Sequence, residues 1–241
     1  MSDDRTSTDA QEQTGAAVVQ GPVAIVTKLS RMPAVTWLTL GVALLALPGL
    51  VTLIDVLGVS LGPLVQGVLQ WAVALAVLGV VVGVEDRSLA SVGVRRPTWW
   101  DVPYLMGTAI AVLAVFIAGP ALLSAAGLPV ADGLSSLEST PGLGVSLFAA
   151  VTTGVVEEML YRGYPLERLL EYTDSPAIAG SLTVTVFTLA HLVTWPVGTV
   201  LLVGMVSAVW TAVYLRRPTL VPVVGSHVGI WVVAVLGQYF A

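Results

Sequence analysis

Cysteine is absent from this chain of 241 residues. Its absence excludes disulfide bonds, thiol nucleophiles and metal sites that need cysteine ligands. Charged residues are also scarce, because they make up 10% of the chain, whereas a soluble domain carries about 25%. Hydrophobic residues account for 56%, and the mean hydropathy is +0.91. This balance predicts an integral membrane protein, and the lack of a basic stripe argues against a nucleic-acid partner.

Long apolar runs account for the hydrophobic excess. A helix that crosses a bilayer needs about 20 largely apolar residues. The stretches that meet this requirement are residues 34–56, 64–84, 103–126, 143–162, 177–195, 197–215 and 220–240. We therefore predict an all-α, polytopic transmembrane helix bundle of about seven spans, with eight as the alternative. The transmembrane domain would cover residues 31–241, after a polar, disordered cytoplasmic tail at residues 1–30.

Lysine and arginine are few, so their positions orient the chain. They precede the first predicted span and follow the second, fourth and sixth: Lys28, Arg31, Arg87, Arg95, Arg96, Arg162, Arg168, Arg216 and Arg217. The alternate connections, 57–63, 127–142 and 195–197, contain neither residue. The positive-inside rule therefore predicts a multi-pass protein of the cell membrane, with a cytoplasmic N-terminus and an outer C-terminus.

An aromatic segment leads into the third predicted span. Trp99, Trp100 and Tyr104 come directly after Arg95 and Arg96. Tryptophan and tyrosine concentrate at the boundary between membrane and water. We therefore expect this segment to anchor the chain at the interface.

Ionisable side chains inside membrane spans are rare, and they are functional candidates by default. In this chain they are Asp55, Glu157, Glu158, His191 and His227. Asp55 ends the first predicted span and is expected to reach the interface. The two glutamates lie on the fourth span, and the two histidines, the only ones in the chain, lie on the fifth and seventh. These four side chains could meet inside the bundle.

The spacing within the fourth span separates the two glutamates. Glu158 and Arg162 are four residues apart, so they share a helix face and can form an ion pair. Glu157 is rotated by about 100° and is not served by that arginine. Glu158 is thus predicted to be structural, while Glu157 remains available as a general base. Phe187 and His191 are also four apart, so the aromatic ring could hold the imidazole in place.

One carboxylate and two imidazoles can act in two ways. They can bind a divalent metal such as zinc, in which case Glu157, His191 and His227 would be the ligands. Alternatively, Glu157 and His191 can hold and deprotonate a water while His227 polarises the carbonyl under attack. Both arrangements lead to hydrolysis of an acyl bond. The zinc-protease motif HExxH is absent.

Three motifs in this order resemble a known family, the CPBP family of CAAX-type and bacteriocin-processing intramembrane endopeptidases. The segment EEMLYR, with Glu157, Glu158 and Arg162, is similar to its EExxxR motif. FTLAH, from Phe187 to His191, is similar to its FxxxH motif. The segment that ends in His227 resembles the approach to its HxxxN motif. The resemblance covers roughly residues 85–235.

The resemblance implies a role for each matching residue. Glu157 would activate a water that His191 shares, and His227 would line the oxyanion site. Glu158 and Arg162 would be the supporting ion pair. The substrate would be a membrane-associated peptide or protein in the lipid bilayer, either prenylated and CAAX-like or of the leader type.

One residue departs from the family pattern. The family has an asparagine or aspartate four residues after the last histidine, and here Trp231 follows His227 at that distance. Loss of one oxyanion donor costs about 10²–10³ in rate. The indole N–H of Trp231 could act in its place, with Phe187 as a second supporting residue. The alternative is a weakened relative that serves as an immunity or scaffold protein of the membrane, and a third hypothesis is a proton- or ion-coupled transporter.

The predicted spans place these residues at different depths. Glu157 comes near the cytoplasmic end of the fourth span, whereas His191 comes near the outer end of the fifth. Straight helices would keep the two side chains apart. The resemblance therefore requires that spans four to six be tilted, broken or offset from these boundaries, and the segments 161–165 and 194–198 contain the proline and glycine that would allow it.

Overall fold

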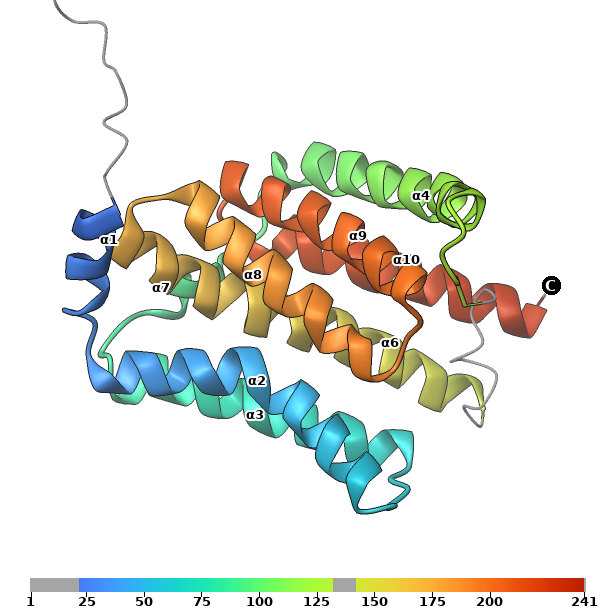
Figure 1. Cartoon of the computed structure of the whole chain (residues 1–241), viewed down its shortest axis with the longest axis horizontal. Coiled ribbons are helices and arrows are strands. Elements are labelled where there is room, and N and C mark those ends of the chain that lie inside the picture. The colour runs from blue at the N-terminus through green and yellow to red at the C-terminus, as the bar shows by residue number, and fades with distance from the viewer. Residues whose placement is uncertain (1–21, 132–141, 241) are drawn as a thin grey trace, which may run out of the picture.

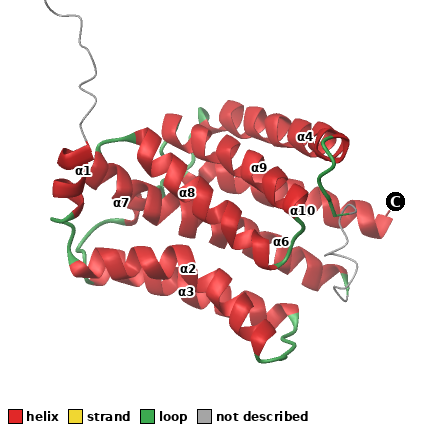
Figure 2. Ribbon diagram, in the orientation of Figure 1, coloured by secondary structure: helices red, strands yellow, loops and turns green. Residues whose placement is uncertain are grey.

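The structure is a computed structural model that describes residues 22–131 and 142–240. Every regular element in that part of the chain is helical (Figure 2). The elements are α1 (Pro22–Leu29), α2 (Ala34–Val56), α3 (Pro63–Gly83), η1 (Leu89–Val92), α4 (Asp101–Ala125), α6 (Leu143–Glu158), η2 (Met159–Gly163), α7 (Tyr164–Thr173), α8 (Pro176–Ala190), η3 (His191–Val193), α9 (Val197–Arg216) and α10 (Leu220–Phe240). Of the predicted tail, residues 22–30 are described, and α1 within them is helical; residues 1–21 lie outside the described part of the chain.

The predicted fold class is confirmed. Among the described residues, 7 helical segments are long and apolar enough to cross a membrane. They follow the predicted spans closely, except that the fourth runs from Leu143 to Thr173. The chain is therefore a multi-pass membrane protein by the length and composition of its helices.

The fourth span is the main correction to the predicted boundaries. We expected it to end at residue 162, where an arginine follows the apolar run. Instead the chain continues through η2, one turn of π-helix, and on through α7. Arg162 and Arg168 do not stop the helix because both are buried and ion-paired, with Glu158 and Glu85 respectively. A paired charge loses most of the penalty that would otherwise drive it to the interface.

The long helix formed by α6, η2 and α7 runs through the middle of the bundle (Figure 1). Helices α2 and α3 lie side by side along one edge of the molecule and contact it there. Helix α10 packs against α6 and α4, while α8 packs against α7 and α9. The central helix is therefore covered on several sides by other helices.

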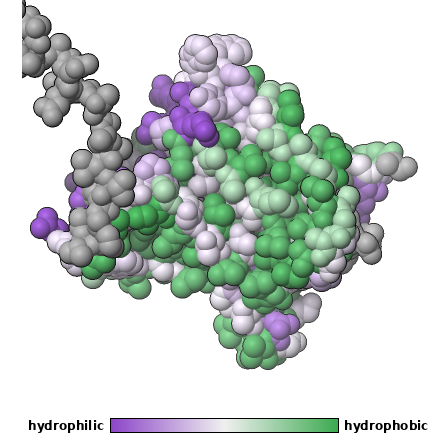
Figure 3. Space-filling model, turned by 45° about the horizontal axis from the view of Figure 1, so that its top comes forward, coloured by the Kyte–Doolittle hydropathy of each residue, from purple (hydrophilic) through white to green (hydrophobic). Residues whose placement is uncertain are grey.

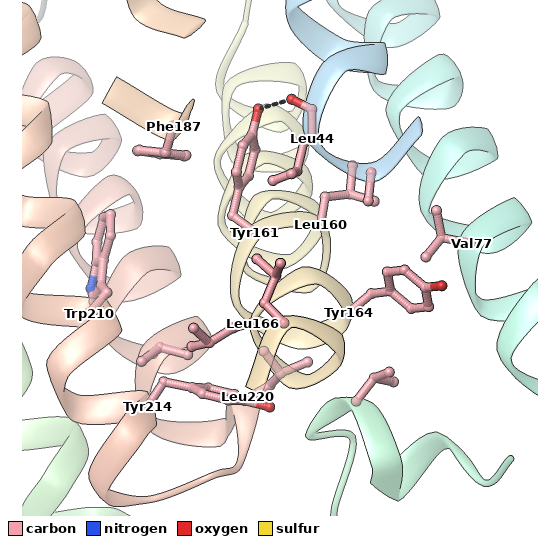
Figure 4. Close-up of a cluster of buried hydrophobic side chains, with 14 of the residues drawn as sticks. Leu44, Val77, Leu160, Tyr161, Tyr164, Leu166, Phe187, Trp210, Tyr214 and Leu220 are labelled. Atoms are coloured by element: carbon pink, nitrogen blue, oxygen red, sulfur yellow. Dashed lines mark hydrogen bonds between the residues drawn. The ribbon is translucent and has the colours of Figure 1, made fainter. Parts of the chain in front are cut away.

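Large apolar side chains of the central helix form the main hydrophobic core. Leu160, Tyr161 and Tyr164 are almost fully buried there. In Figure 4, Phe187 and Trp210 lie on one side of this helix, away from Tyr164. The Tyr161 hydroxyl donates to the Leu44 carbonyl oxygen at 3.3 Å, which ties the core to α2.

The outer surface is largely apolar, as expected for a protein in contact with lipid. Hydrophobic residues cover much of the face in Figure 3, and hydrophilic ones gather toward its edges. Exposed examples include Leu38 on α2, Ile117 on α4 and Leu122 on α4. Such a surface would be unfavourable in water and is suited to the hydrocarbon core of a bilayer.

Charged side chains gather at one end of the bundle, where α7 ends and α3 leads into η1. Glu85 accepts hydrogen bonds there from Arg168 at 2.7 and 3.0 Å, from the Tyr164 hydroxyl at 2.7 Å and from Thr36 at 3.1 Å. These contacts join the α2–α3 pair to the central helix. Further ion pairs at this end link Arg87 to Glu171 and Lys28 to Asp174.

We expect the Glu85 contacts to make stability depend on pH. Burial alone would raise the pKa of Glu85, but hydrogen bonds from Arg168, Tyr164 and Thr36 hold it below its ordinary value of 4.5. Because the folded-state pKa is lowered, ionised Glu85 stabilises the fold above the unfolded pKa, and this contribution is lost as the pH falls through the folded pKa. Glu85→Gln should lower the free energy of unfolding by about 2 kcal/mol at neutral pH.

Denaturant titration of the protein in detergent, at neutral pH and at successively lower values, measures this effect. The difference between the parent and Glu85→Gln should shrink once the pH is below the ordinary value of 4.5. Asp86→Asn is the matched control, because Asp86 is exposed and its positive φ of 52° suits asparagine. An equal loss in that control, or a difference that does not change with pH, would contradict the prediction.

Candidate functional site

The central element of the candidate site is the buried carboxylate of Glu158, the last residue of α6. Its side chain is 0% exposed, and Arg162 donates to its Oε1 atom at 3.0 Å. The predicted ion pair is therefore present in the structure. It forms across the first residues of η2, where the π-helical turn adjusts the direction of the central helix.

The guanidinium of Arg162 is held by α9 as well as by Glu158. It donates to Ser207 Oγ at 2.5 Å and to Thr211 Oγ1 at 3.4 Å. Its carbon Cζ also lies 4.5 Å from the ring centre of Phe187 and 5.5 Å from that of Trp210. These aromatic faces stabilise the cation without competing for its donors.

His227 reaches the same carboxylate from α10. Its Nδ1 atom lies 2.9 Å from Glu158 Oε1, and the imidazole is almost fully buried. The Trp210 indole stacks on the imidazole, with ring centres 4.0 Å apart and planes inclined by 20°. Trp210 is itself fixed, because its Nε1–H donates to Ser226 Oγ at 3.1 Å.

The proton positions on His227 follow from this partner. An ionised Glu158 has only acceptor atoms, so Nδ1 carries the hydrogen that joins them. The second nitrogen, Nε2, is then the atom that is left for chemistry. Among the described residues, Glu158 Oε2 is a buried oxygen without a hydrogen-bond partner.

Close approach of α6 and α10 makes the contact between Glu158 and His227 possible. Gly154 is one turn before Glu158, and a Cβ atom built on it would lie 2.6 Å from Val228 Cγ2 and 2.9 Å from the Val228 backbone nitrogen. Val228 is the neighbour of His227 in the chain. Only glycine at residue 154 therefore lets the two helices pack this closely.

His191 lies at the end of α8 and begins the short helix η3. Its Nδ1 atom is 2.7 Å from the Phe187 carbonyl oxygen. A carbonyl oxygen can only accept, so Nδ1 is again the donor and Nε2 of a neutral imidazole is left as the acceptor. The Phe187 ring lies 4.7 Å from the His191 ring, which confirms that the aromatic residue contacts the imidazole.

The depth conflict between the fourth and fifth spans disappears in this structure. The central helix and α8 form a hairpin that turns between Thr173 and Pro176 (Figure 1). Glu158 is 15 residues before Thr173, and His191 is 15 residues after Pro176. Both therefore lie about 22 Å from the turn. The longer fourth span brings them to the same level.

Glu157 is half-buried and makes no hydrogen bond or ion pair within the part of the chain that the structure describes. It is one helical turn before Tyr161, whose ring packs edge-on against Phe187 at 4.8 Å. His191 is one turn after Phe187. In an antiparallel hairpin, these two steps lead to the same level on facing sides.

Five of the predicted site residues thus form one continuous set of contacts: Glu158, Arg162, Phe187, His191 and His227. Trp231 is separate from this set. It packs against the second hydrophobic cluster, around Ala150 and Val235. Its indole nitrogen has no hydrogen-bond partner among residues 22–131 and 142–240.

The predicted metal ligands are not gathered into a metal site. Within the described residues, no group of three or more His, Cys, Asp or Glu side chains is placed to hold a metal ion. The Nδ1 atoms of His191 and His227 are engaged by Phe187 and Glu158, which leaves the Nε2 atom of each imidazole for other partners. Because Glu157, His191 and His227 are not grouped together, the arrangement of the described residues does not fit a three-ligand metal centre.

Sequence reasoning missed the residues of α9 and α10 that hold the ionisable groups. Trp210 and Thr211 lie three and four residues after Ser207 on an apolar helix, so both neighbour it on one face. Ser226 precedes His227 directly. These residues carry no charge, but uncharged polar residues on one face of a span also indicate an internal partner, and that signal could have found them.

Comparison with known families matches residues 139–233 to the family described as type II CAAX prenyl endopeptidase Rce1-like. That family consists of proteases, and the match confirms the resemblance to the CPBP family. No curated protein and no solved structure matches the chain. The matched segment includes every residue of the contact set around Glu158.

We expect Gly154→Ala to disturb the Glu158–His227 contact, since the added Cβ would push α10 away from α6. Overpacking of this kind costs about 1–3 kcal/mol in unfolding free energy. Gly229→Ala is the matched control, because a Cβ on Gly229 meets nothing within 4 Å and alanine is the better helix former. Denaturant titration in detergent compares the two, and equal stability of both variants would contradict the prediction.

Proposed function

We propose that this chain is an intramembrane endopeptidase, because its residues 139–233 match the family described as type II CAAX prenyl endopeptidase Rce1-like. It hydrolyses a peptide bond with a water that Glu157 and His191 activate together. The supporting observation is the contact set that joins Glu158, Arg162, His191 and His227 inside the bundle.

Glu157 and His191 are assigned to the water because both have free acceptor atoms. Glu157 makes no hydrogen bond within the described residues, so its carboxylate is available as a base. His191 donates through Nδ1 to Phe187, which turns the lone pair of Nε2 toward other partners. The hairpin register supports a shared position, since each residue lies one turn beyond the contact between Tyr161 and Phe187.

His227 is assigned to the oxyanion side of the reaction. When both of its nitrogens are protonated, Nδ1 donates to Glu158 and Nε2–H can donate to the negative oxygen that develops. The Glu158 carboxylate, which also pairs with Arg162, lies directly beside the positive charge that the imidazole then carries. The stacked Trp210 ring restricts the imidazole to one orientation, which supports preorganisation of this donor.

Glu157 carries one proton from the attacking water to the leaving amine during the proposed hydrolysis. A proton of the water passes to the Glu157 carboxylate as the water oxygen bonds to the carbonyl carbon. The carbonyl oxygen becomes the oxyanion and is stabilised by the Nε2–H of His227. As the carbon–nitrogen bond breaks, the proton moves from Glu157 to the leaving amine, which releases a new carboxyl and a new amino end.

The substrate is proposed to be a membrane-associated peptide, either CAAX-like and prenylated or of the leader type. The contact set lies about 22 Å along the hairpin from its turn, so it is within the membrane-spanning part of the bundle. A substrate must therefore enter from the bilayer or its surface. The chain is proposed to lie in the cell membrane with its N-terminus in the cytoplasm, because the arginine-rich connections would then be cytoplasmic.

Glu157→Gln and His191→Ala test the proposal. Each should lower the cleavage rate of a prenylated or leader-type peptide in liposomes by about 10²–10⁴, as expected for loss of acid–base catalysis. Both variants should remain folded, because neither side chain forms an ion pair within the described residues. Mass spectrometry of the peptide products measures the rate and identifies the bond that is cut.

Asp55→Asn is the control, since it also removes one carboxylate from a membrane span and lies at an exposed position on α2. It should cut at the parental rate. If Glu157→Gln and His191→Ala cut as fast as this control, the proposed water activation is wrong.

A second candidate function rests on Trp231. The indole takes the place of the family's asparagine and packs into the apolar cluster around Ala150 and Val235. A protein without that side-chain donor can be a weakened relative that binds a partner as an immunity or scaffold protein. Loss of one oxyanion donor lowers the catalytic rate by about 10²–10³, which favours this alternative.

Trp231→Asn separates the two candidates. If the parent is a protease that lacks one donor, the substitution should raise the cleavage rate by about tenfold or more. Trp231→Phe is the control, because it removes the indole N–H and adds no side-chain amide. No cleavage by the parent or by Trp231→Asn, with all variants folded, would support the weakened relative.

A further inference from the structure

A small cavity lies at the charged end of the bundle, between the segment that leads into α4 and the turn from α9 to α10. Its volume is about 230 Å³. The polar side chains that line it are Arg95, Arg96, Thr98, Asp101, Arg217 and Thr219. None of these residues belongs to the contact set around Glu158, so the cavity is a separate feature of the molecule.

Part of this lining is held rigidly. Arg217 donates from Nε to Asp101 Oδ1 at 2.8 Å and from Nη2 to Thr98 Oγ1 at 2.7 Å. Asp101 is almost fully buried, and its Oδ2 accepts from the Thr98 backbone N–H at 2.6 Å. The charge of Arg217 is thus balanced by Asp101, and these hydrogen bonds fix the wall of the cavity.

The remaining two guanidinium groups have no such balance. Arg95 donates to the Ala90 carbonyl oxygen at 3.3 Å and interacts with the half-buried Glu167 through its charge, without an ion pair. Neither Arg95 nor Arg96 is ion-paired to a carboxylate of the described residues. Both are exposed. With Arg217 and Asp101 cancelling, the lining keeps two positive charges. Guanidinium groups present paired N–H donors that match the oxygens of a phosphate.

The cavity also lies where lipid headgroups would be. Trp99 and Trp100 lie in the chain between the lining residues Thr98 and Asp101, just before α4 begins. Their side chains are 90% and 73% exposed. Large exposed indoles at the end of a membrane helix are typical of the headgroup region. The other wall is formed at the end of α9, another candidate span. The basic lining therefore faces the boundary between membrane and water.

We propose that this cavity binds a phosphate group, supplied by the headgroup of an anionic membrane lipid. Its size supports a ligand of this kind, because drug-sized ligands occupy about 300–1,000 Å³ and the cavity is smaller. Arg95 and Arg96 bind the phosphate oxygens, and Arg217 closes the site from the side of α9. Trp99 and Trp100 hold the neighbouring acyl chains and glycerol region of the membrane. A basic site between the ends of membrane helices is a recognised setting for anionic headgroups.

Native mass spectrometry of the full chain in detergent tests the proposal, with phosphatidylglycerol, phosphatidylcholine and inorganic phosphate as three separate probes. The parent should bind phosphatidylglycerol more tightly than phosphatidylcholine. The double variant Arg95→Gln, Arg96→Gln should bind phosphatidylglycerol about twenty-five-fold more weakly, from about fivefold for each basic residue near an anionic headgroup. Arg31→Gln is the matched control, because Arg31 is exposed and lies outside the cavity.

The outcomes separate the sources of the phosphate. Phosphatidylglycerol binding that depends on Arg95 and Arg96 supports the lipid. Binding of inorganic phosphate alone, with the same dependence, retains the phosphate site and overturns the lipid as its source. Equal binding of both lipids without phosphate binding, or equal losses in Arg31→Gln and the double variant, overturns the proposal. If the double variant unfolds at a lower temperature, Arg96→Gln alone should show the fivefold loss.

Discussion

The buried carboxylate of Glu158 accepts from two cationic or basic side chains at once, and the arrangement of the other helices depends on this contact. Arg162 approaches it from the next turn of the same helix, and His227 approaches it from α10. An isolated carboxylate inside a membrane protein would be strongly unfavourable. Its partners must therefore come to it, which constrains how α9 and α10 pack against the central helix.

Two features of helix packing allow Arg162 and His227 to contact the Glu158 carboxylate. Gly154 removes the side chain that would separate α6 from α10 near His227. Phe187 and Trp210 then place aromatic faces against the guanidinium of Arg162, so the cation is enclosed without a second carboxylate. Because the charges balance locally, the bundle can hold them far from water. Because Arg162 and His227 both contact Glu158, Glu157 is left without a hydrogen bond or ion pair within the described residues.

The charged end of the bundle follows a similar principle at the membrane surface. Glu85 gathers Arg168, Tyr164 and Thr36 into one group and thereby joins α2 and α3 to the central helix. Arg95 and Arg96 lack a carboxylate partner of this kind and face a cavity. Unbalanced positive charge at a membrane boundary is suited to anionic groups from outside the chain.

The order and number of the membrane helices could be predicted from the sequence, because a bilayer demands long apolar runs and the charges between them are few. The pairing of Glu158 with Arg162 could also be predicted, since it depends only on a spacing of four residues.

The contact between Glu158 and His227 could not be predicted from local spacing, because 69 residues separate them. The end of the fourth span was also misjudged, since only a tertiary partner, Glu85, explains why Arg168 stays buried in a helix. The sequence by itself thus determined which ionisable side chains the membrane spans carry. Only helix packing decided how deep each charge lies and which residue pairs with it, because a buried charge needs a partner that can be far away in the chain.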